Sequence, residues 1–123
     1  MKPFLVLLLP LFLLGCGSSE EAAIAAIERL RGNVTLDDVS GAVIQVDLHD
    51  PQITDAALVH LKDLTRLESL QVWDTQITDA GLKHLRVLAS LKSLYLYDTM
   101  VTDAGLSQIK AALPKCGIHH GVQ

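Results

Sequence analysis

The sequence predicts an α/β protein built as a short solenoid, with parallel strands on one side and helices on the other. A nine-residue phrase occurs three times at a spacing of 24 residues, at positions 50–58, 74–82 and 98–106. A fixed period of this length indicates a stack of equivalent units, each of which buries its apolar side against the next. Each period also holds an alternating apolar segment followed by leucines three residues apart, which predicts a strand and then a helix.

Residues 1–15 are expected to be a signal peptide of the lipoprotein type. Lys2 precedes an apolar run over 4–14, which is shorter than the roughly 20 residues that a membrane-spanning helix needs. The run ends in Leu-Leu-Gly-Cys, which looks like a bacterial lipoprotein signal in which Cys16 becomes the lipidated first residue. Ordinary secretion and an uncleaved anchor are the alternatives. Residues 16–19 then form a short tether.

Residues 20–42 are expected to form an N-terminal cap, because the end units of a stack need a cover. Ser18 and Glu21 have the spacing of a capping box, which predicts the start of a helix. Gly32 is a natural stop for that helix, and residues 33–36 are expected to add a strand. The helix presents one apolar stripe, made of Ile24, Ile27 and Leu30.

Residues 43–113 contain the three repeated units. Their strands are expected where apolar residues alternate, within 43–48, 67–73 and 91–97. In each unit a threonine is placed to start the helix, and the aspartate after it favours the positive end of the helix dipole. Two equivalent apolar sets follow the same step: Leu61, Leu85 and Ile109, and Leu64, Leu88 and Ala112. Residues 114–123 are expected to form a C-terminal cap with a short strand and a tail.

The three units resemble leucine-rich repeats of the Thr-Asp-x-Gly-Leu type that is common in bacterial proteins. The resemblance covers residues 43–113 and rests on the motif L-x-x-L-x-L-x-x-T-x-I-T-D-x-G-L-x-x-L-x-x-L. It implies strands on a concave side, helices on a convex side and ligand binding on the concave face. There are departures: Ala57 replaces the glycine of the first copy, and Pro51, Thr75 and Thr99 stand where many such repeats have asparagine.

The charge balance and the lack of catalytic motifs exclude several classes of function. The chain has 14 acidic and 10 basic residues and a net charge of −4, which argues against nucleic-acid binding and against an electrostatic membrane patch. The sequence has no nucleophile elbow, phosphate loop, zinc-protease motif or paired-cysteine site. We therefore expect neither an enzyme nor a cofactor.

The candidate binding surface is the strand face that points away from the core. Outside the signal segment the chain has only three aromatic residues of the Phe, Tyr and Trp types, which are Trp73, Tyr95 and Tyr97, and all three are predicted on this face. Aromatic side chains gather at binding surfaces because they give a large contact area at low entropic cost. Alternatively, they form cross-strand pairs that stabilise the sheet without a ligand. The predicted surroundings of these aromatics are Asp47, His49, Gln71 and Asp74.

Histidine and cysteine residues raise the question of a metal site or a reactive thiol. His60 and His84 occupy equivalent helix positions, but two ligands without a supporting carboxylate or thiolate make a weak site. His49 beside Asp47 and Asp50 is the one mixed cluster on the concave rim. We expect no metal, and we expect Cys116 to pack against the last unit rather than react.

The sequence as a whole predicts a protein- or peptide-binding module that is held in the bacterial cell envelope by a lipid on Cys16. Its face would lie in the periplasm or on the outer surface, and the chain would be a monomer. The alternatives are a glycan- or cell-wall-binding module, a structural spacer without a specific ligand, and a secreted rather than an anchored protein.

Overall fold

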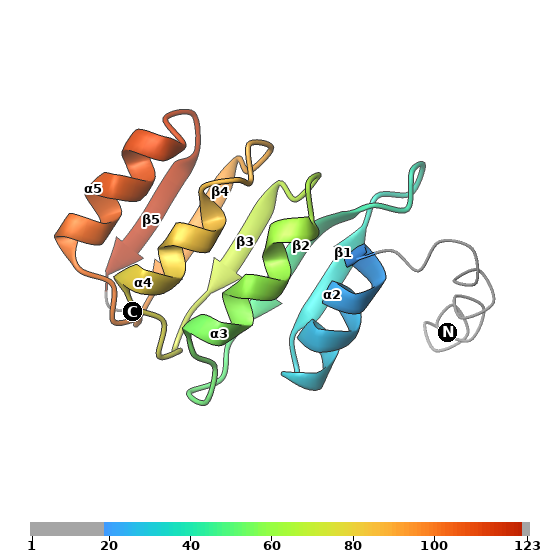
Figure 1. Cartoon of the computed structure of the whole chain (residues 1–123), viewed down its shortest axis with the longest axis horizontal. Helices are drawn as coiled ribbons and strands as arrows, with labels where there is room; N and C mark the ends of the chain where they lie inside the picture. The colour runs from blue at the N-terminus through green and yellow to red at the C-terminus, as the bar shows by residue number, and fades with distance from the viewer. Residues whose placement is uncertain (1–18, 122–123) are drawn as a thin grey trace.

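The computed structural model describes residues 19–121, so the expected signal peptide and Cys16 lie outside the described residues. The fold is α/β, and its helices cover one face of a five-stranded, mostly parallel sheet (Figure 1). The strands are β1 (Asn33–Leu36), β2 (Val43–Leu48), β3 (Ser69–Val72), β4 (Ser93–Tyr97) and β5 (Gly117–Gly121). The helices are α2 (Ser19–Arg29), α3 (Asp55–Leu58), α4 (Asp79–Leu82) and α5 (Asp103–Ala112), and the 3₁₀ segments η1 (Val59–Asp63) and η2 (Lys83–Leu85) follow α3 and α4.

The order of the strands in the sheet is their order in the chain. The strands from β2 to β5 are parallel, and each pairs with the next so that Gln45, Ser69, Ser93 and Gly117 lie side by side. The pairing therefore has the same 24-residue step as the repeated phrase. Strand β1 pairs with β2 in the antiparallel sense, in the segment where the sequence predicts a strand. The chain therefore crosses the sheet from the β1 edge to the β5 edge without returning to an earlier strand.

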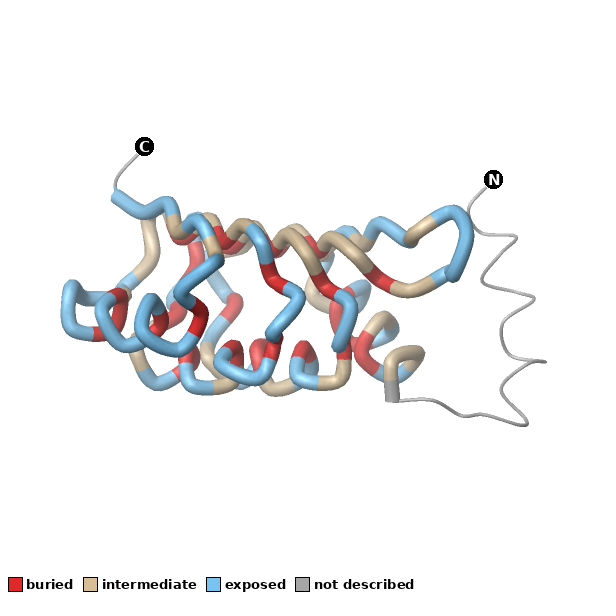
Figure 2. The backbone as a smooth tube through the Cα atoms, turned by 90° about the horizontal axis from the view of Figure 1, so that it is seen from above, coloured by how far each residue is buried: buried red, intermediate tan, exposed pale blue. Residues whose placement is uncertain are grey.

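The core lies between the sheet and the helices, where the buried residues collect in Figure 2. Alternate strand residues point into this layer and are fully or almost fully buried: Val46, Leu48, Leu70, Val72, Leu94 and Leu96. The residues between them point to the other side of the sheet. We call that side the open face; its positions are Gln45, Asp47, Ser69, Gln71, Trp73, Ser93, Tyr95 and Tyr97, together with the residues of β1 and β5 that pair with them.

The helical segments differ from the expectation of three equal α-helices. In the first two units one α-helical turn continues as a 3₁₀ segment or a turn, whereas α5 is α-helical throughout. A 3₁₀-helix has three residues per turn, so side chains three apart eclipse, and the leucines of the second unit, Leu82, Leu85 and Leu88, have that spacing. The last unit instead buries Leu106, Ile109 and Leu113, a spacing of three and then four that suits an α-helix. The expected equivalence of Ala112 with Leu64 and Leu88 is therefore wrong, because Ala112 is exposed and Leu113 is buried.

The threonine caps are confirmed in the second and third units and are incomplete in the first. The Thr78 hydroxyl accepts a hydrogen bond from the Ala80 N–H at 3.2 Å, and the Thr102 hydroxyl accepts one from the Gly105 N–H at 3.4 Å. Thr54 precedes α3 in the same extended conformation, but its side chain makes no cap hydrogen bond.

The aspartates that follow the first two threonines do more than complement the helix dipole. The Asp55 carboxylate accepts hydrogen bonds from the Thr78 N–H, at 2.7 Å, and from the Thr78 hydroxyl. Asp79 accepts the same pair from Thr102, and these bonds hold the pKa of the Asp79 carboxyl below its ordinary value. The Asp79 link is therefore kept as the pH falls, until that lowered pKa is passed. These aspartates join each unit to the next.

The end of α2 also differs from the sequence prediction. Arg31, not Gly32, adopts the left-handed conformation that ends the helix, with φ of 65°. The Gly32 N–H then donates to the Ile27 carbonyl at 2.9 Å, as in a Schellman motif. Gly32 is needed for a different reason, since a Cβ atom on it would lie 2.7 Å from the Leu48 Cδ2 atom.

We predict that Thr75→Val raises the stability of the protein. Thr75 is buried, and its hydroxyl has no hydrogen-bond partner among residues 19–121. Because a buried hydroxyl without a partner keeps its full desolvation cost, its removal is expected to add about 1 kcal/mol to the free energy of unfolding in urea. Thr99→Val is the matched control, since the hydroxyl of Thr99 donates to the Leu96 carbonyl at 3.4 Å. An equal gain in both variants would contradict this explanation.

Candidate functional site

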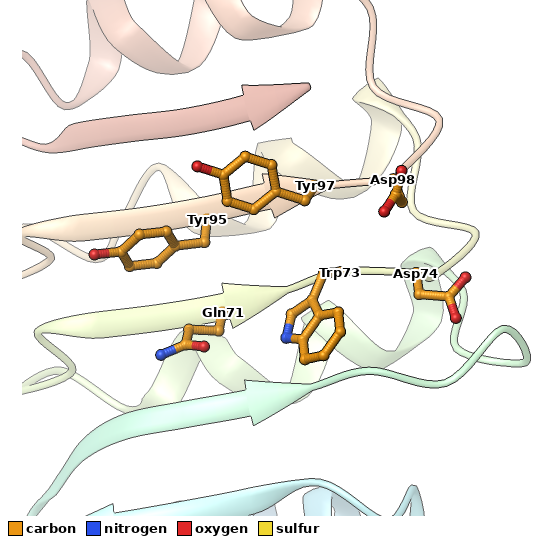
Figure 3. Close-up of a pocket in the computed structure, with 6 residues that line it drawn as sticks. All are labelled: Gln71, Trp73, Asp74, Tyr95, Tyr97 and Asp98. Carbon is orange, nitrogen blue, oxygen red and sulfur yellow. The ribbon is translucent and has the colours of Figure 1, made fainter. Parts of the chain in front are cut away.

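The most distinct feature of the open face is a hollow at the carboxyl ends of β3 and β4. It has a volume of about 340 Å³. Figure 3 shows Trp73 and Tyr97 at its centre, with Gln71 and Tyr95 further back along the strands. Asp74 and Asp98 lie at its other end, where the two strands finish. The hollow therefore joins aromatic, amide and carboxylate groups on two neighbouring strands.

Two features of the sequence place these side chains. The alternation along β3 and β4 buries Leu70, Val72, Leu94 and Leu96, and so directs the residues between them to the open face. Asp74 and Asp98 then take left-handed backbone conformations, with φ of 55° and 54°. Aspartate is among the few residues other than glycine that tolerate this region.

The left-handed turns lock the ends of neighbouring strands together. The N–H of Asp74 donates to the Tyr97 carbonyl at 3.0 Å, and the N–H of Asp98 donates to the Gly121 carbonyl at 2.9 Å. One strand back, the N–H of Trp73 donates to the Leu48 carbonyl at 3.1 Å. Trp73 and Tyr97 are thus held at equivalent positions on adjacent strands, which makes the aromatic part of the hollow a fixed surface.

Aromatic contacts extend this surface beyond the hollow on both sides. The rings of His49 and Trp73 are 4.8 Å apart between centroids, and those of Tyr95 and Tyr97 are 6.4 Å apart. His119 stacks on Tyr95, at 4.6 Å with an angle of 12° between the ring planes. Trp73 remains 39% exposed. These contacts orient the rings and leave part of Trp73 accessible to a ligand.

The structure brings together most of the residues that the sequence predicts for the site. Five of them line the hollow: Gln71, Trp73, Asp74, Tyr95 and Tyr97. His49 touches the outer side of Trp73. Asp47 lies one strand away beside Gln71, where its carboxylate accepts a hydrogen bond from the Gln45 amide at 3.5 Å. Asp47 therefore does not line the hollow.

Two residues of the site are absent from the sequence prediction. Asp98 lines the hollow beside Asp74. The sequence feature that indicates it is the aspartate repeated at the end of each strand. His119 joins the aromatic surface, and it lies 24 residues after Tyr95 in the row of Gln71 and Tyr95. An extension of the 24-residue period by one step, from Tyr95 into the C-terminal cap, identifies His119.

The lining of the hollow offers several kinds of non-covalent contact. It supplies stacking faces, hydrogen-bonding groups and two carboxylates. No group of three or more histidine, cysteine, aspartate or glutamate residues within 19–121 is placed to hold a metal ion. Cys116 is a free thiol that packs against the core, and burial raises the pKa of this thiol, which makes it less reactive at neutral pH.

No model of a known protein family matches the sequence, and no curated protein matches it either. In the part of the chain that the structure describes, no helix has the length and apolar character needed to cross a bilayer.

Proposed function

We propose that this protein is a non-enzymatic binding module that holds a protein or peptide on its open face. The observation that carries the proposal is the placement of Trp73, Tyr95 and Tyr97, none of which is used in the core. All three line one hollow. Burial of apolar side chains drives folding, so aromatic residues on the surface forgo that stabilisation, and their grouping in one hollow favours a binding role.

The proposed class of protein is the leucine-rich repeat, and the open face is then the concave face of a short solenoid. The proposal is supported by the 24-residue step of the phrase and by strand pairing with the same step. The Asp–Thr links between successive units add to it. In such stacks the strand face is an extended surface for partners.

The proposed location is the bacterial cell envelope, with the chain attached by a lipid on Cys16 and facing the periplasm or the outside. We predict that the chain expressed in a bacterial host incorporates radiolabelled palmitate. Cys16→Ala is expected to abolish the label because it removes the only thiol at the expected cleavage site. Cys116→Ala is the control and should keep the label; unlabelled wild-type protein would contradict the anchor and favour secretion.

The binding proposal is tested by Trp73→Ala combined with Tyr97→Ala. We expect this variant to lose at least about thirtyfold in affinity when it captures partners from solubilised envelopes, since the truncation of one aromatic anchor costs about 2 kcal/mol or more. The measurement is quantitative capture on the immobilised full chain. Ser69→Ala with Ser93→Ala is the matched control, because these residues lie on the same face outside the hollow. Unchanged capture by the aromatic variant would remove the basis of the proposal.

A glycan is the second candidate ligand, and the side-by-side Trp73 and Tyr97 rings favour it specifically. Aromatic faces stack on the apolar faces of sugar rings, so a cell-wall fragment fits the same surface. The chain contains one tryptophan, so the fluorescence of Trp73 reports directly on what occupies the hollow.

A further inference from the structure

The hollow places carboxylates next to exposed aromatic faces. Asp74 and Asp98 line its end at the strand exits, directly after Trp73 and Tyr97 in the chain (Figure 3). Aromatic faces carry negative partial charge and attract cations, most strongly for tryptophan. A carboxylate beside such a face adds a full negative charge for the same cation. The two kinds of group therefore favour one sign of ligand charge.

The strand positions of the open face carry no lysine or arginine. The open-face positions of the five strands hold asparagine, threonine, glutamine, aspartate, serine, histidine, glycine and the aromatic residues. The whole chain is also acidic, with a net charge of −4. A neutral ligand would gain no electrostatic attraction from this arrangement, whereas a basic ligand would be attracted before it makes contact.

We propose that the hollow receives an arginine or lysine side chain of a bound peptide, an inference that rests on the proposed function and specifies its ligand. The long methylene stem of such a side chain lies along the faces of Trp73 and Tyr97. Its charged end then reaches the carboxylate of Asp74 at the exit of β3. The volume of about 340 Å³ is at the lower end for ligand pockets, which suits one side chain better than a large molecule.

The experiment begins with a random peptide library displayed on phage and selected on the immobilised full chain in detergent. Peptides that depend on Trp73 and Tyr97 are identified by their loss on the double alanine variant. These peptides are resynthesised with citrulline in place of arginine or acetyllysine in place of lysine. Each pair is then titrated against wild-type protein by the fluorescence of Trp73. The matched peptides differ only in charge and in the hydrogen bonds of one side chain.

The expected result is an enrichment of arginine and lysine among the selected peptides. Neutralising the basic side chain should weaken binding by about tenfold or more, and added salt should weaken only the basic peptide strongly. Asp74→Asn should weaken it by about threefold to tenfold, and asparagine tolerates the left-handed backbone at this position. Glu28→Gln is the matched control, because it removes one exposed negative charge from α2, in the helix layer.

Three results would overturn the inference, and they differ in what they mean for the proposed function. Selected peptides that bind through Trp73 and Tyr97 without basic enrichment, or that bind equally as citrulline peptides, would overturn the ligand chemistry alone. A selection that recovers no peptide dependent on Trp73 and Tyr97 would overturn the proposed function as well. Quenching of Trp73 by an N-acetylglucosamine oligosaccharide, unaffected by Asp74→Asn and by salt, with no peptide bound, would assign the hollow to a glycan instead.

Discussion

Leu70→Ala is expected to lower the free energy of unfolding by about 3–5 kcal/mol, the range for a leucine truncated in a rigid core. Leu70 is fully buried and lies in the central strand of the sheet, between Val46 of β2 and Leu94 of β4. The surrounding strands are paired on both sides and cannot move in to fill the space. Domains of this size are stable by only about 5–15 kcal/mol, so the variant is expected to be partly unfolded at 37 °C.

Ser69→Ala is the control for this prediction, because Ser69 precedes Leu70 and points to the open face. Its effect is expected to stay within about 0.5 kcal/mol, as for most surface substitutions. Both variants are measured by urea unfolding followed by circular dichroism. Similar losses in the two variants would mean that the inside and outside of β3 are wrongly assigned.

The second large effect is expected from Gly81→Ala. Alanine normally favours a helix over glycine by about 1 kcal/mol, so the substitution in α4 would be stabilising on propensity alone. A Cβ atom at this position, however, would collide with the Asp55 carboxylate and lie 3.0 Å from the Leu58 Cδ1 atom. The same carboxylate accepts the two hydrogen bonds from Thr78. We therefore expect a loss of about 1–3 kcal/mol, as for overpacked cores.

A double-mutant cycle separates the collision from other causes. In an Asp55→Ala background the carboxylate is gone, and Gly81→Ala is then expected to be neutral or to stabilise the protein by up to about 1 kcal/mol. Additive losses in the cycle would contradict the proposed contact. Ala57→Gly is a further comparison with an expected loss of about 1–2 kcal/mol, since it lowers helix propensity and removes a buried methyl group.

The contact between glycine and aspartate also explains a difference among the three copies of the phrase. The first unit has Ala57 where the later units have Gly81 and Gly105. The residue 24 positions before Asp55 is Arg31 and not an aspartate, so the sequence offers no equivalent of the carboxylates that lie against Gly81 and Gly105. Glycine therefore occurs at positions 81 and 105, where the aspartate of the preceding unit lies against the helix.

The coarse architecture could be predicted because it depends on short-range patterns. Alternation of apolar residues located β2, β3 and β4, and the 24-residue period placed them side by side in the observed register. The same register put Trp73, Tyr95 and Tyr97 on one face. A sheet face is decided by burial at alternate positions, which a single sequence reveals directly.

The rest depended on interactions that a single sequence does not display. The 3₁₀ segments follow from leucines three apart, a spacing that one turn of an α-helix also allows. The bonds from Asp55 to Thr78 and from Asp79 to Thr102 connect residues 23 apart, and their local sequence looks like helix capping. His119 was missed because β5 lacks the leucine pattern of the other strands, although it continues their register.

The order of the strands has a consequence for how the chain folds. Since each strand neighbours the next one in the chain, every parallel pairing closes a loop of the same length, and none waits for a distant segment. The entropic cost of closing the loop is therefore about equal at each step. We expect the sheet to grow from any completed pair of strands and to fold faster than a parallel sheet whose strands pair with distant segments. During synthesis the ribosome releases the strands in the order in which the sheet accepts them, so each new strand finds its partner already in place.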